Sequence, residues 1–319
     1  MLLDDDRHLA KIVLHEKVLE GVASSALPFM IKGSFLHCRC FPRPRERLRL
    51  SDGPDFVALT PYWGCVKDTT GNGLNRIAAE TGIDEVLRLV AGVLEREWKA
   101  VGGSGGVCGM PPVAISKEIF AEDDFSTLRA TVAHAGESYV LDFAVNLCLY
   151  EPPVSSLYKP VRGIPFTLPY AASMEVQVAW KLHQCLIRAR AKDLVDLIYM
   201  LGDINLVDEK CLYAVLKTAL GECHESAQSE ILVGRLRSLL ALDTGFIHDQ
   251  MTKSKDLAYF RRHAMNFGSF LSGRDDDIVD NLFFRFEMAL RDSLQHARWN
   301  EVMEAIIEKR DYMSIAIEL

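Results

Sequence analysis

The chain has 319 residues, 49% of them apolar and 25% charged, so it is long enough for two domains and can build a large core without disulfide bonds. A net charge of −8 and a pI near 5.6 argue against a protein that coats nucleic acid non-specifically, because such binding needs a basic surface. The eight cysteines form no CxxC pair, so we expect them to be reduced. The N-terminus does not resemble a signal peptide, and no apolar run approaches the ~20 residues of a membrane span. We therefore expect a cytoplasmic protein with no membrane partner.

The first predicted elements are a helix and a short strand. Residues 5–24 carry apolar side chains at helical spacing. The segment that begins at Pro28 is predicted as a short apolar strand over residues 28–32, followed by a turn at Gly33 and Ser34. A glycine after a strand lets backbone N–H groups approach a phosphate, although a Gly-Ser pair alone is more often an ordinary turn.

A basic loop and a second strand follow. Residues 39–49 contain five arginines against one glutamate, and the prolines among them indicate a loop. This loop is either a solvated connection or an anion-binding segment. Residues 56–59 form an apolar strand with Asp52 and Asp55 at its entrance. Two carboxylates at the mouth of a strand can hold Mg²⁺ against a nucleoside triphosphate, but they are also common in turns.

The middle of the chain predicts a helix, a linker and a hairpin. Residues 75–101 have a helical pattern and end in a glycine-rich segment, VGGSGGVCGMPP, which lacks the pattern of a P-loop or a dinucleotide site. Extended segments are expected at residues 127–133 and 138–148, joined by a turn. Asp142 lies inside the second of these apolar strands. Because a buried unpaired carboxylate is costly, Asp142 is expected at a strand edge or beside a cation, such as a metal ion.

Helices are expected to dominate the remainder of the chain. Residues 151–170 are rich in proline and are interpreted as a connection to a helix that begins near Ser173. Further helices are expected at residues 208–220, 228–242, 255–271 and 276–309. The sequence therefore predicts an α+β fold, a mixed sheet flanked by helices, with an N-terminal lobe over residues 1–170 and a helical lobe over residues 171–319.

The segment at residues 179–201 has the most unusual charge pattern. On one continuous helix, at about 100° per residue, Lys181, Arg188, Lys192 and Asp196 line one edge while leucines cover the other face. Such a stripe is most often the solvated side of a helix. The high aliphatic content instead favours a largely buried helix, whose charges need partners or a ligand. An internal salt-bridge network is the third interpretation.

Taken in order, these segments resemble the AbiEii/AbiGii toxin family, a branch of the polymerase-β-like nucleotidyltransferases of bacterial toxin-antitoxin and phage-resistance systems. The resemblance covers residues 28–202. It rests on a strand with a Gly-Ser turn, an Arg-containing loop with strand-entrance aspartates, a later Asp-bearing strand, and a Lys-Leu helix with a K-D-x-x-D pattern. In this chain these motifs read IKGSFL, RLSDGPDFV, VLDFAV and KLHQCLIRARAKDLVDL.

The resemblance implies transfer of an NMP group from an NTP to a tRNA or protein acceptor with Mg²⁺ or Mn²⁺, and it implies a cognate antitoxin as a possible partner. Metal ligands implied by it are Asp52, Asp55 and Asp142. The implied nucleotide-binding residues are Lys32, Gly33, Ser34, Arg49, Arg188 and Lys192. The implied catalytic residues are Asp55, Lys181, Asp193 and Asp196.

The family motif is altered at one position. Aligned on Arg49 and Asp55, the first aspartate of the family's Asp-x-Asp is Gly53, and Pro54 follows it. Either Asp52 replaces the missing ligand by a one-residue shift, or the metal site is weakened. The second possibility implies a catalytically weakened nucleotide-binding or regulatory protein of the same fold.

Overall fold

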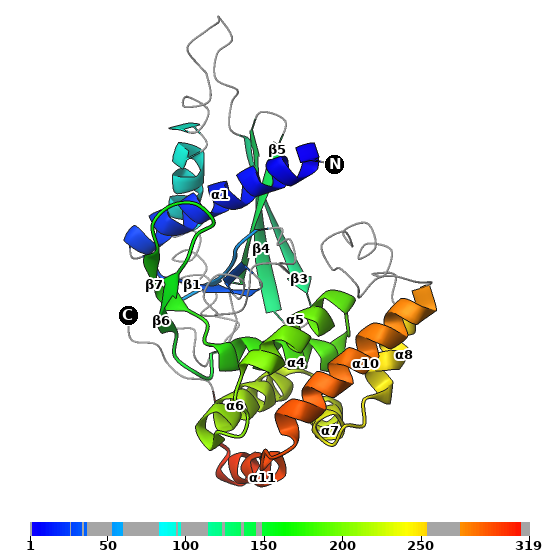
Figure 1. The fold of residues 1–319 in the computed structure, drawn as a ribbon. Helices are drawn as coiled ribbons and strands as arrows, with labels where there is room; N and C mark the ends of the chain where they lie inside the picture. Colours follow the sequence, from blue (N-terminus) through cyan, green and yellow to red (C-terminus); the bar gives the residue numbers. More distant parts are fainter. Residues whose placement is uncertain are drawn as a thin grey trace, which may run out of the picture.

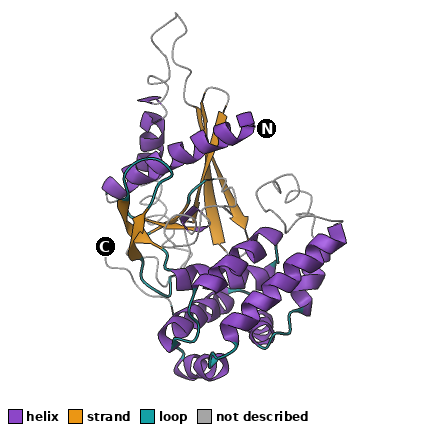
Figure 2. Cartoon of the chain, in the orientation of Figure 1, coloured by secondary structure: helices purple, strands orange, loops and turns teal. Residues whose placement is uncertain are grey.

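The computed structural model contains a mixed sheet followed by a group of helices (Figures 1 and 2). The described residues are 2–25, 27–33, 35–36, 53–59, 83–93, 95–96, 114–122, 125–134, 137–144, 149–253 and 275–313. The strands are β1 (Phe29–Lys32), β2 (Asp55–Ala58), β3 (Ala114–Glu122), β4 (Phe125–His134), β5 (Glu137–Ala144), β6 (Val154–Tyr158) and β7 (Phe166–Ala171).

The seven strands of this sheet lie in the order β3-β4-β5-β2-β1-β7-β6. Strands β2 and β5 are parallel, as are β1 and β7, and the other neighbours are antiparallel. Residues that are distant in the sequence therefore meet at the centre of the sheet. Phe29, Phe56 and Phe143 come from three different strands, and their rings pack with centroids 5.2–6.0 Å apart.

The strand predictions are confirmed for β1, β2, β4 and β5 and wrong for two other regions. Residues 151–170, predicted as a connection, contain β6 and β7. Here the prolines lie mostly in the turns, and Ala172 N donates to Ile31 O at 2.9 Å, which joins the end of β7 to β1. Strand β3 was not predicted, because its sequence, AISKEIFAE, lacks a clear apolar alternation. It forms through its backbone pairing with β4 along its whole length.

Two helical segments pack in the sheet region. Helix α1 (Leu2–Ser24) confirms the predicted helix at residues 5–24 and buries Leu14, Val18 and Leu19. Residues 83–93 form a helix that fits the predicted segment, and Gly21 of α1 lies against Leu89 of it. The outer parts of the predicted helix at 75–101, the glycine-rich segment and the arginine loop lie outside the described residues.

The C-terminal half is helical, which confirms the predicted α+β fold class. Its helices are α4 (Met174–Ile187), α5 (Ala191–Asp203), α6 (Glu209–Glu225), α7 (Ser229–Leu240), α8 (Gly245–Lys253), α10 (Asp275–Leu294) and α11 (Trp299–Lys309). The predicted cap at Ser173 is present, since its Oγ accepts a hydrogen bond from Val176 N at 3.3 Å. The single helix predicted at 276–309 is wrong, because it is broken into α10 and α11. The helix predicted at 255–271 lies outside the described residues.

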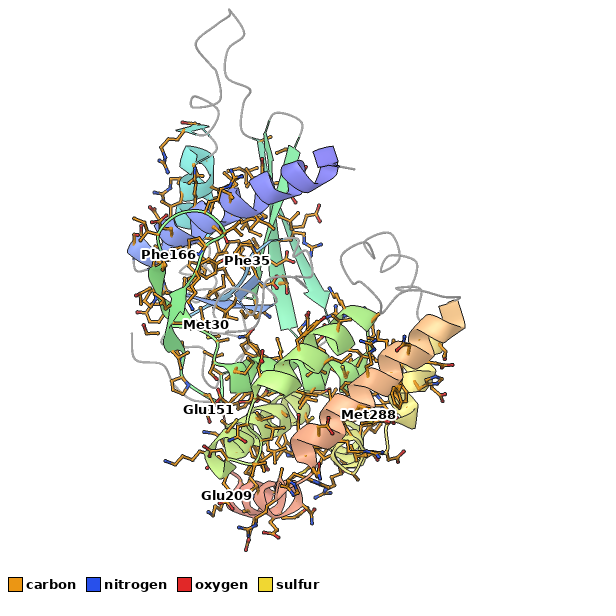
Figure 3. The ribbon with its side chains drawn as sticks, in the orientation of Figure 1. Met30, Phe35, Glu151, Phe166, Glu209 and Met288 are labelled. Atoms are coloured by element: carbon orange, nitrogen blue, oxygen red, sulfur yellow. The ribbon has the colours of Figure 1, made fainter. Side chains whose placement is uncertain are left out.

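Buried apolar residues form two separate clusters. One extends from Leu14 to Val176 around the sheet, and the other extends from Val178 to Ile306 among the helices. Figure 3 shows Met30, Phe35 and Phe166 in the sheet region and Met288 in the helical region. Helix α4 contributes to both clusters, so Lys181 and Leu182 of the Lys-Leu motif lie on the helix at their junction.

The continuous helix predicted over residues 179–201 is wrong. Helix α4 ends at Ile187, Arg188 has an extended backbone, and α5 begins at Ala191. Other helices satisfy the backbone groups exposed by this break: Gln250 Oε1 accepts from Ala189 N at 2.8 Å, and Arg235 Nη1 donates to Leu186 O at 2.6 Å. The alignment of Lys181, Arg188 and Lys192 along one helix edge therefore does not occur.

Two further expectations concern cysteines and membranes. Cys185, Cys211 and Cys223 are free thiols, and two of them are buried. Across the described ranges, the helices are either too short or too polar to cross a membrane.

Candidate functional site

Three predicted site residues lie side by side on the sheet. Lys32 on β1 is the register partner of Asp55 on β2, and Asp55 is the register partner of Asp142 on β5. Register partners on neighbouring strands project from the same face of a sheet. The sheet pairing therefore brings together residues 32, 55 and 142 of the sequence, as the metal-site prediction required for the two aspartates.

The buried setting of Lys32 and Asp55 opposes the charge of each side chain. Burial raises the pKa of Asp55, the charge of Asp142 raises it further, and the charges of Lys32, Lys192 and Lys181 oppose the rise without cancelling it. Burial likewise lowers the pKa of Lys32, although Asp55 and Glu222 oppose this shift. Each charge therefore costs free energy in the ligand-free protein.

Gly33 determines how closely the backbone approaches Asp55. Its φ is +80°, and a Cβ at this position would lie 2.4 Å from Asp55 Oδ2. Any other residue would be strained and would displace the carboxylate, so a glycine is required at this turn. The space beside Gly33 is filled by the Asp55 carboxylate, so contact of Gly33 with a ligand stays a prediction. Ser34, which follows it, lies outside the described residues.

Gly53 is required by packing. A Cβ on Gly53 would lie 2.4 Å from the carbonyl oxygen of Val140 and 3.2 Å from His15 Cε1. An aspartate therefore cannot replace Gly53 without moving the β5 backbone. The position that aligns with the first aspartate of the resembling motif therefore has no room for a side chain in this structure. Asp52 and Arg49 lie outside the described residues, so the proposed one-residue shift stays a prediction.

Asp142 has a strong partner on the neighbouring strand. Arg129 on β4 is its register partner and donates from Nε to Oδ1 at 2.7 Å and from Nη2 to Oδ2 at 2.6 Å. This bidentate pair supplies the cation that the sequence predicted beside a carboxylate in an apolar strand. Arg129 itself was not predicted, because nothing in the sequence indicates its register with Asp142.

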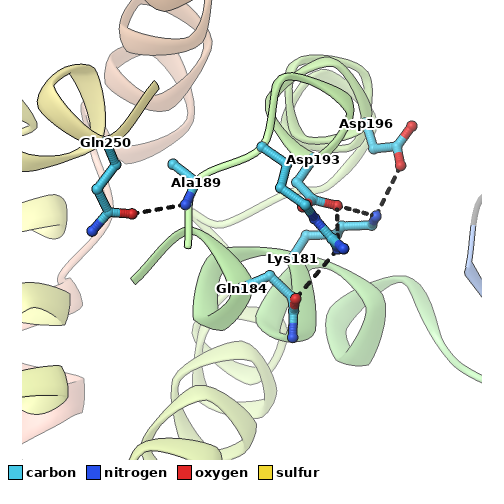
Figure 4. Close-up of polar contacts among 7 residues, drawn as sticks. Lys181, Gln184, Ala189, Asp193, Asp196 and Gln250 are labelled. Carbon is cyan, nitrogen blue, oxygen red and sulfur yellow. Dashed lines mark hydrogen bonds and ion pairs between the residues drawn. The ribbon is translucent and has the colours of Figure 1, made fainter. Parts of the chain in front are cut away.

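The helical side of the site is a buried ion cluster. Lys181 Nζ on α4 lies 2.6 Å from Asp193 Oδ1 and 2.9 Å from Asp196 Oδ2, both on α5 (Figure 4). On a continuous helix, residues 181 and 193 would be about 18 Å apart along the axis, so the break between the helices makes this contact possible. Arg190 Nε donates to Asp193 Oδ2 at 2.5 Å and completes the cluster.

The Asp193 carboxylate is strongly stabilised in its ionised form. Burial alone would raise its pKa, but the positive charges of Lys181 and Arg190 and the hydrogen bond from Arg190 hold the pKa well below its ordinary value. Its side chain has 0% exposure, and that of Lys181 has 15%. The internal salt-bridge network that was one interpretation of this segment is therefore present.

The other two cations of the segment have different positions. Lys192 lies at the start of α5, and its charge acts on both Asp55 and Asp193. Arg188 lies in the turn between the helices with an exposed side chain. The structure thus brings Lys192 and Lys181 into the electrostatic environment of Asp55, while it places Arg188 in an exposed turn.

Trp180 and Glu222, which were not predicted as site residues, link the sheet side and the helical side of the site. The Lys32 ammonium lies 5.4 Å from the centroid of the Trp180 ring. The Trp180 Nε1 donates to Glu222 Oε1 on α6 at 3.0 Å, and Glu222 also acts electrostatically on Lys32. Trp180 directly precedes Lys181 of the Lys-Leu motif, so the sequence could have indicated it. Glu222 comes 42 residues later and has no motif to indicate it.

The donors near Asp55 are compatible with one divalent cation. Among the described residues, no group of three or more His, Cys, Asp and Glu side chains is placed to hold a metal. Asp55 and Asp142 are nevertheless neighbours whose mutual repulsion contributes to the raised pKa of Asp55, and a cation would relieve this repulsion. Mg²⁺ commonly uses one or two carboxylates together with water and substrate phosphates, so two such ligands fit it.

Comparisons with known proteins add little to this geometry. No protein-family model matches the chain, and no curated protein matches it. Among solved structures, the chain is similar to MenT4, a nucleotidyltransferase toxin from Mycobacterium tuberculosis H37Rv. The match has 17% sequence identity, covers 90% of this chain and 93% of that one, and has a TM-score of 0.39.

Proposed function

We propose that this protein is a cytosolic bacterial nucleotidyltransferase that moves an NMP group from an NTP to an RNA or protein acceptor. The observation that carries the proposal is the register of Lys32, Asp55 and Asp142, with the charges of Lys181 and Lys192 acting on the same carboxylate. Phosphoryl-type transfer depends mainly on positioning and on stabilising negative charge, which carboxylates with a metal and surrounding cations can supply.

The proposed roles combine the positions of the described residues with the family resemblance of residues 28–202. Asp55 and Asp142, with Asp52, would hold Mg²⁺, which when bound neutralises phosphate charge and orients the phosphate oxygens. Gly33 and Ser34 would bind the triphosphate through the backbone, and Lys32, Lys192, Arg188 and Arg49 would provide positive charge around it. In the transfer, an acceptor hydroxyl forms a bond to the α-phosphorus as the bond to pyrophosphate breaks.

We assign Asp193 and Asp196 to positioning. Both carboxylates are buried and hold the Lys181 ammonium at 2.6 and 2.9 Å. Fixed in this way, the ammonium contributes a constant positive potential at Asp55 and at any phosphate beside it. This assignment changes the expectation that Asp193 and Asp196 themselves act on the substrate.

The test is transfer of label from each of the four NTPs to total tRNA and to protein extract, with Mg²⁺ present. We expect labelling of one acceptor class by the wild-type protein and a loss of at least about 100-fold with Asp55→Ala, as expected when a metal ligand is removed. Asp280→Ala, at a carboxylate with 69% exposure on α10, is the matched control and should label normally. Equal labelling by wild type and Asp55→Ala would exclude the proposed mechanism.

A second candidate is a nucleotide-binding or regulatory protein with weakened catalysis. It is favoured by the packing at Gly53, which excludes the family's first aspartate, and by the engagement of Asp142 with Arg129. Calorimetry with ATP, GTP, CTP and UTP separates the two candidates. Nucleotide binding that needs no Mg²⁺, together with no transfer to either acceptor, would favour this second function.

The toxin role and its antitoxin partner are part of the same proposal. They rest on the family resemblance of residues 28–202. Induced expression of the wild-type protein is expected to arrest bacterial growth, whereas Asp55→Ala should not. Growth arrest by both variants would separate toxicity from nucleotide transfer.

A further inference from the structure

The pair formed by Arg129 and Asp142 occupies a carboxylate that the proposed function needs. Both Asp142 oxygens accept hydrogen bonds from the guanidinium, at 2.7 and 2.6 Å. The pair is only partly buried, with exposed fractions of 41% for the Arg129 side chain and 25% for that of Asp142. A cation from solvent can therefore reach Asp142, but it has to compete with an existing partner.

From this geometry we propose that Arg129 is a displaceable counter-ion of the metal site, whose bond to Asp142 lowers the affinity for the divalent cation. The inference rests on the proposed function, because it takes Asp142 as a metal ligand. In the ligand-free protein the guanidinium neutralises Asp142. Metal binding at Asp142 draws electron density of at least one oxygen away from the guanidinium, so that the hydrogen bond of this oxygen to Arg129 weakens or breaks.

The charge distribution around Asp55 is consistent with such an exchange. Asp55 on β2 is the register partner of Asp142 and lies beside it on the same face of the sheet. Arg129 lies on the far side of Asp142 from Asp55, since the strand order is β4-β5-β2. It can therefore compensate Asp142 directly, and a divalent cation between the two aspartates would compensate both.

Asp193 illustrates what a permanent pairing looks like in the same protein. Its side chain has no exposure and contacts two cations, Lys181 and Arg190, which are both 15% exposed. Asp142 is more exposed than Asp193, and the two hydrogen bonds described for it come from a single arginine. This difference in access favours an exchangeable pair at Asp142.

The experiment measures Mn²⁺ affinity by electron paramagnetic resonance, using Mn²⁺ alone as the probe. Arg129→Gln removes the guanidinium charge and is expected to bind Mn²⁺ about five- to tenfold more tightly than wild type, in line with the modest strength of a partly exposed ion pair. Arg129→Lys keeps the charge without the bidentate geometry and should be intermediate. Arg237→Gln removes an arginine from an exposed pair in the helical region and should have no effect.

A double-mutant cycle connects the effect to Asp142. In the Asp142→Asn background, Arg129→Gln should no longer raise the Mn²⁺ affinity, because the ligand for which Arg129 competes has been removed. If the Arg129–Asp142 pair were purely structural, these substitutions would change the melting temperature without this dependence of the Mn²⁺ affinity on Asp142. Circular dichroism establishes that each variant is folded, and Arg129→Lys provides the comparison if Arg129→Gln is not.

The outcomes separate this inference from the proposed function. Mn²⁺ binding that depends on Asp55 but is unchanged or weakened by Arg129→Gln would overturn the inference and leave the proposed function intact. No Asp55-dependent Mn²⁺ binding by wild type or by Arg129→Gln, with or without NTP, would overturn both. A wild type that binds weakly and an Arg129→Gln variant that binds tightly would support the inference.

Discussion

The sheet side and the helix side of the candidate site contain similar residues in opposite electrostatic states. On the helix side, Asp193 is held by Lys181 and Arg190, and its pKa lies well below the ordinary value. On the sheet side, burial raises the pKa of Asp55 and lowers that of Lys32 although the two are register partners. Both sides contain lysines and aspartates in a desolvated setting.

Under the proposed function, this difference distinguishes the structural cluster around Asp193 from the candidate binding site around Asp55. Short, multiple hydrogen bonds compensate the cost of burying Asp193, so its charge stabilises the fold. Burial disfavours the charged forms of Asp55 and Lys32, which makes this pair a candidate binding site under the proposed function. Variants that remove one charge from each side should therefore have different effects on stability.

The largest effect is expected from Asp193→Asn. Removing this charge leaves the Lys181 and Arg190 cations with less compensation in a buried setting, which should lower the unfolding free energy by about 3 kcal/mol or more at pH 7. Urea unfolding followed by circular dichroism measures the change. Glu304→Gln, which affects an exposed pair with Arg237, is the control and should change the unfolding free energy by less than about 1 kcal/mol.

The pH dependence of the same variant gives a second measurement. Because the pKa of Asp193 is lowered in the folded state, its contribution is fully present above the unfolded pKa of about 4 and is lost as the pH falls through the folded pKa. The difference between wild type and Asp193→Asn should therefore shrink below about pH 4. A constant difference from pH 7 to pH 3 would contradict the charge-based explanation.

The next effect is expected at Gly53. Gly53→Ala would place a Cβ 2.4 Å from the Val140 carbonyl oxygen, and the required backbone shift should cost about 1–3 kcal/mol. Thermal and urea unfolding both measure this cost. Gly234→Ala is the matched control, since its Cβ would meet nothing within 4 Å in helix α7, and it should stabilise the protein by about 0.5–1 kcal/mol.

Gly53→Asp tests the same position with the residue of the family motif. We expect it to destabilise the protein at least as much as Gly53→Ala and to leave Mn²⁺ affinity no higher. A stable variant with tighter Mn²⁺ binding would mean that the chain had simply lost a ligand there. That result would contradict the packing explanation.

An effect no larger than that of Gly53→Ala is expected from Glu222, which joins the two sides. Glu222→Ala leaves the Trp180 indole N–H without this acceptor and should cost about 1–3 kcal/mol of unfolding free energy. Glu222→Gln keeps an acceptor oxygen and should cost less than half as much. Tryptophan fluorescence, compared with that of a Trp180→Phe variant, reports whether the ring environment changes. Glu308→Ala, at an exposed position on α11, should match wild type in both measurements.

The smallest effect on stability is expected from Asp55→Asn, although it should abolish Mn²⁺ binding. A raised folded pKa means that stability is present below the unfolded pKa and is lost as the pH rises through the folded pKa. At pH 7, relief of the disfavoured Asp55 charge and loss of its attraction for the buried Lys32 act in opposite directions, so the unfolding free energy should change by about 1 kcal/mol or less, and any gain should disappear below about pH 4. A loss comparable to that of Asp193→Asn would remove the contrast between the two sides.

Several parts of the fold were predictable because they depend on local patterns. Apolar spacing located α1, β1, β2, β4 and β5, and Ser173 marked the start of α4. Strands β6 and β7 were missed because their prolines resemble a linker. The break between α4 and α5 was missed because no proline or glycine marks it, and its backbone groups are satisfied by Arg235 and Gln250 from helices distant in the sequence.

By itself, the sequence determined the α+β class and the types of residue gathered in the candidate site. The tertiary structure decided which charges meet, because register and helix packing depend on contacts between distant segments. Strand register placed Asp55 between Lys32 and Asp142 and paired Asp142 with Arg129. The break after α4 turned Lys181 toward Asp193 and Asp196. The charges of Lys181 and Arg190 then lower the pKa of Asp193 in spite of its burial, whereas burial raises the pKa of Asp55.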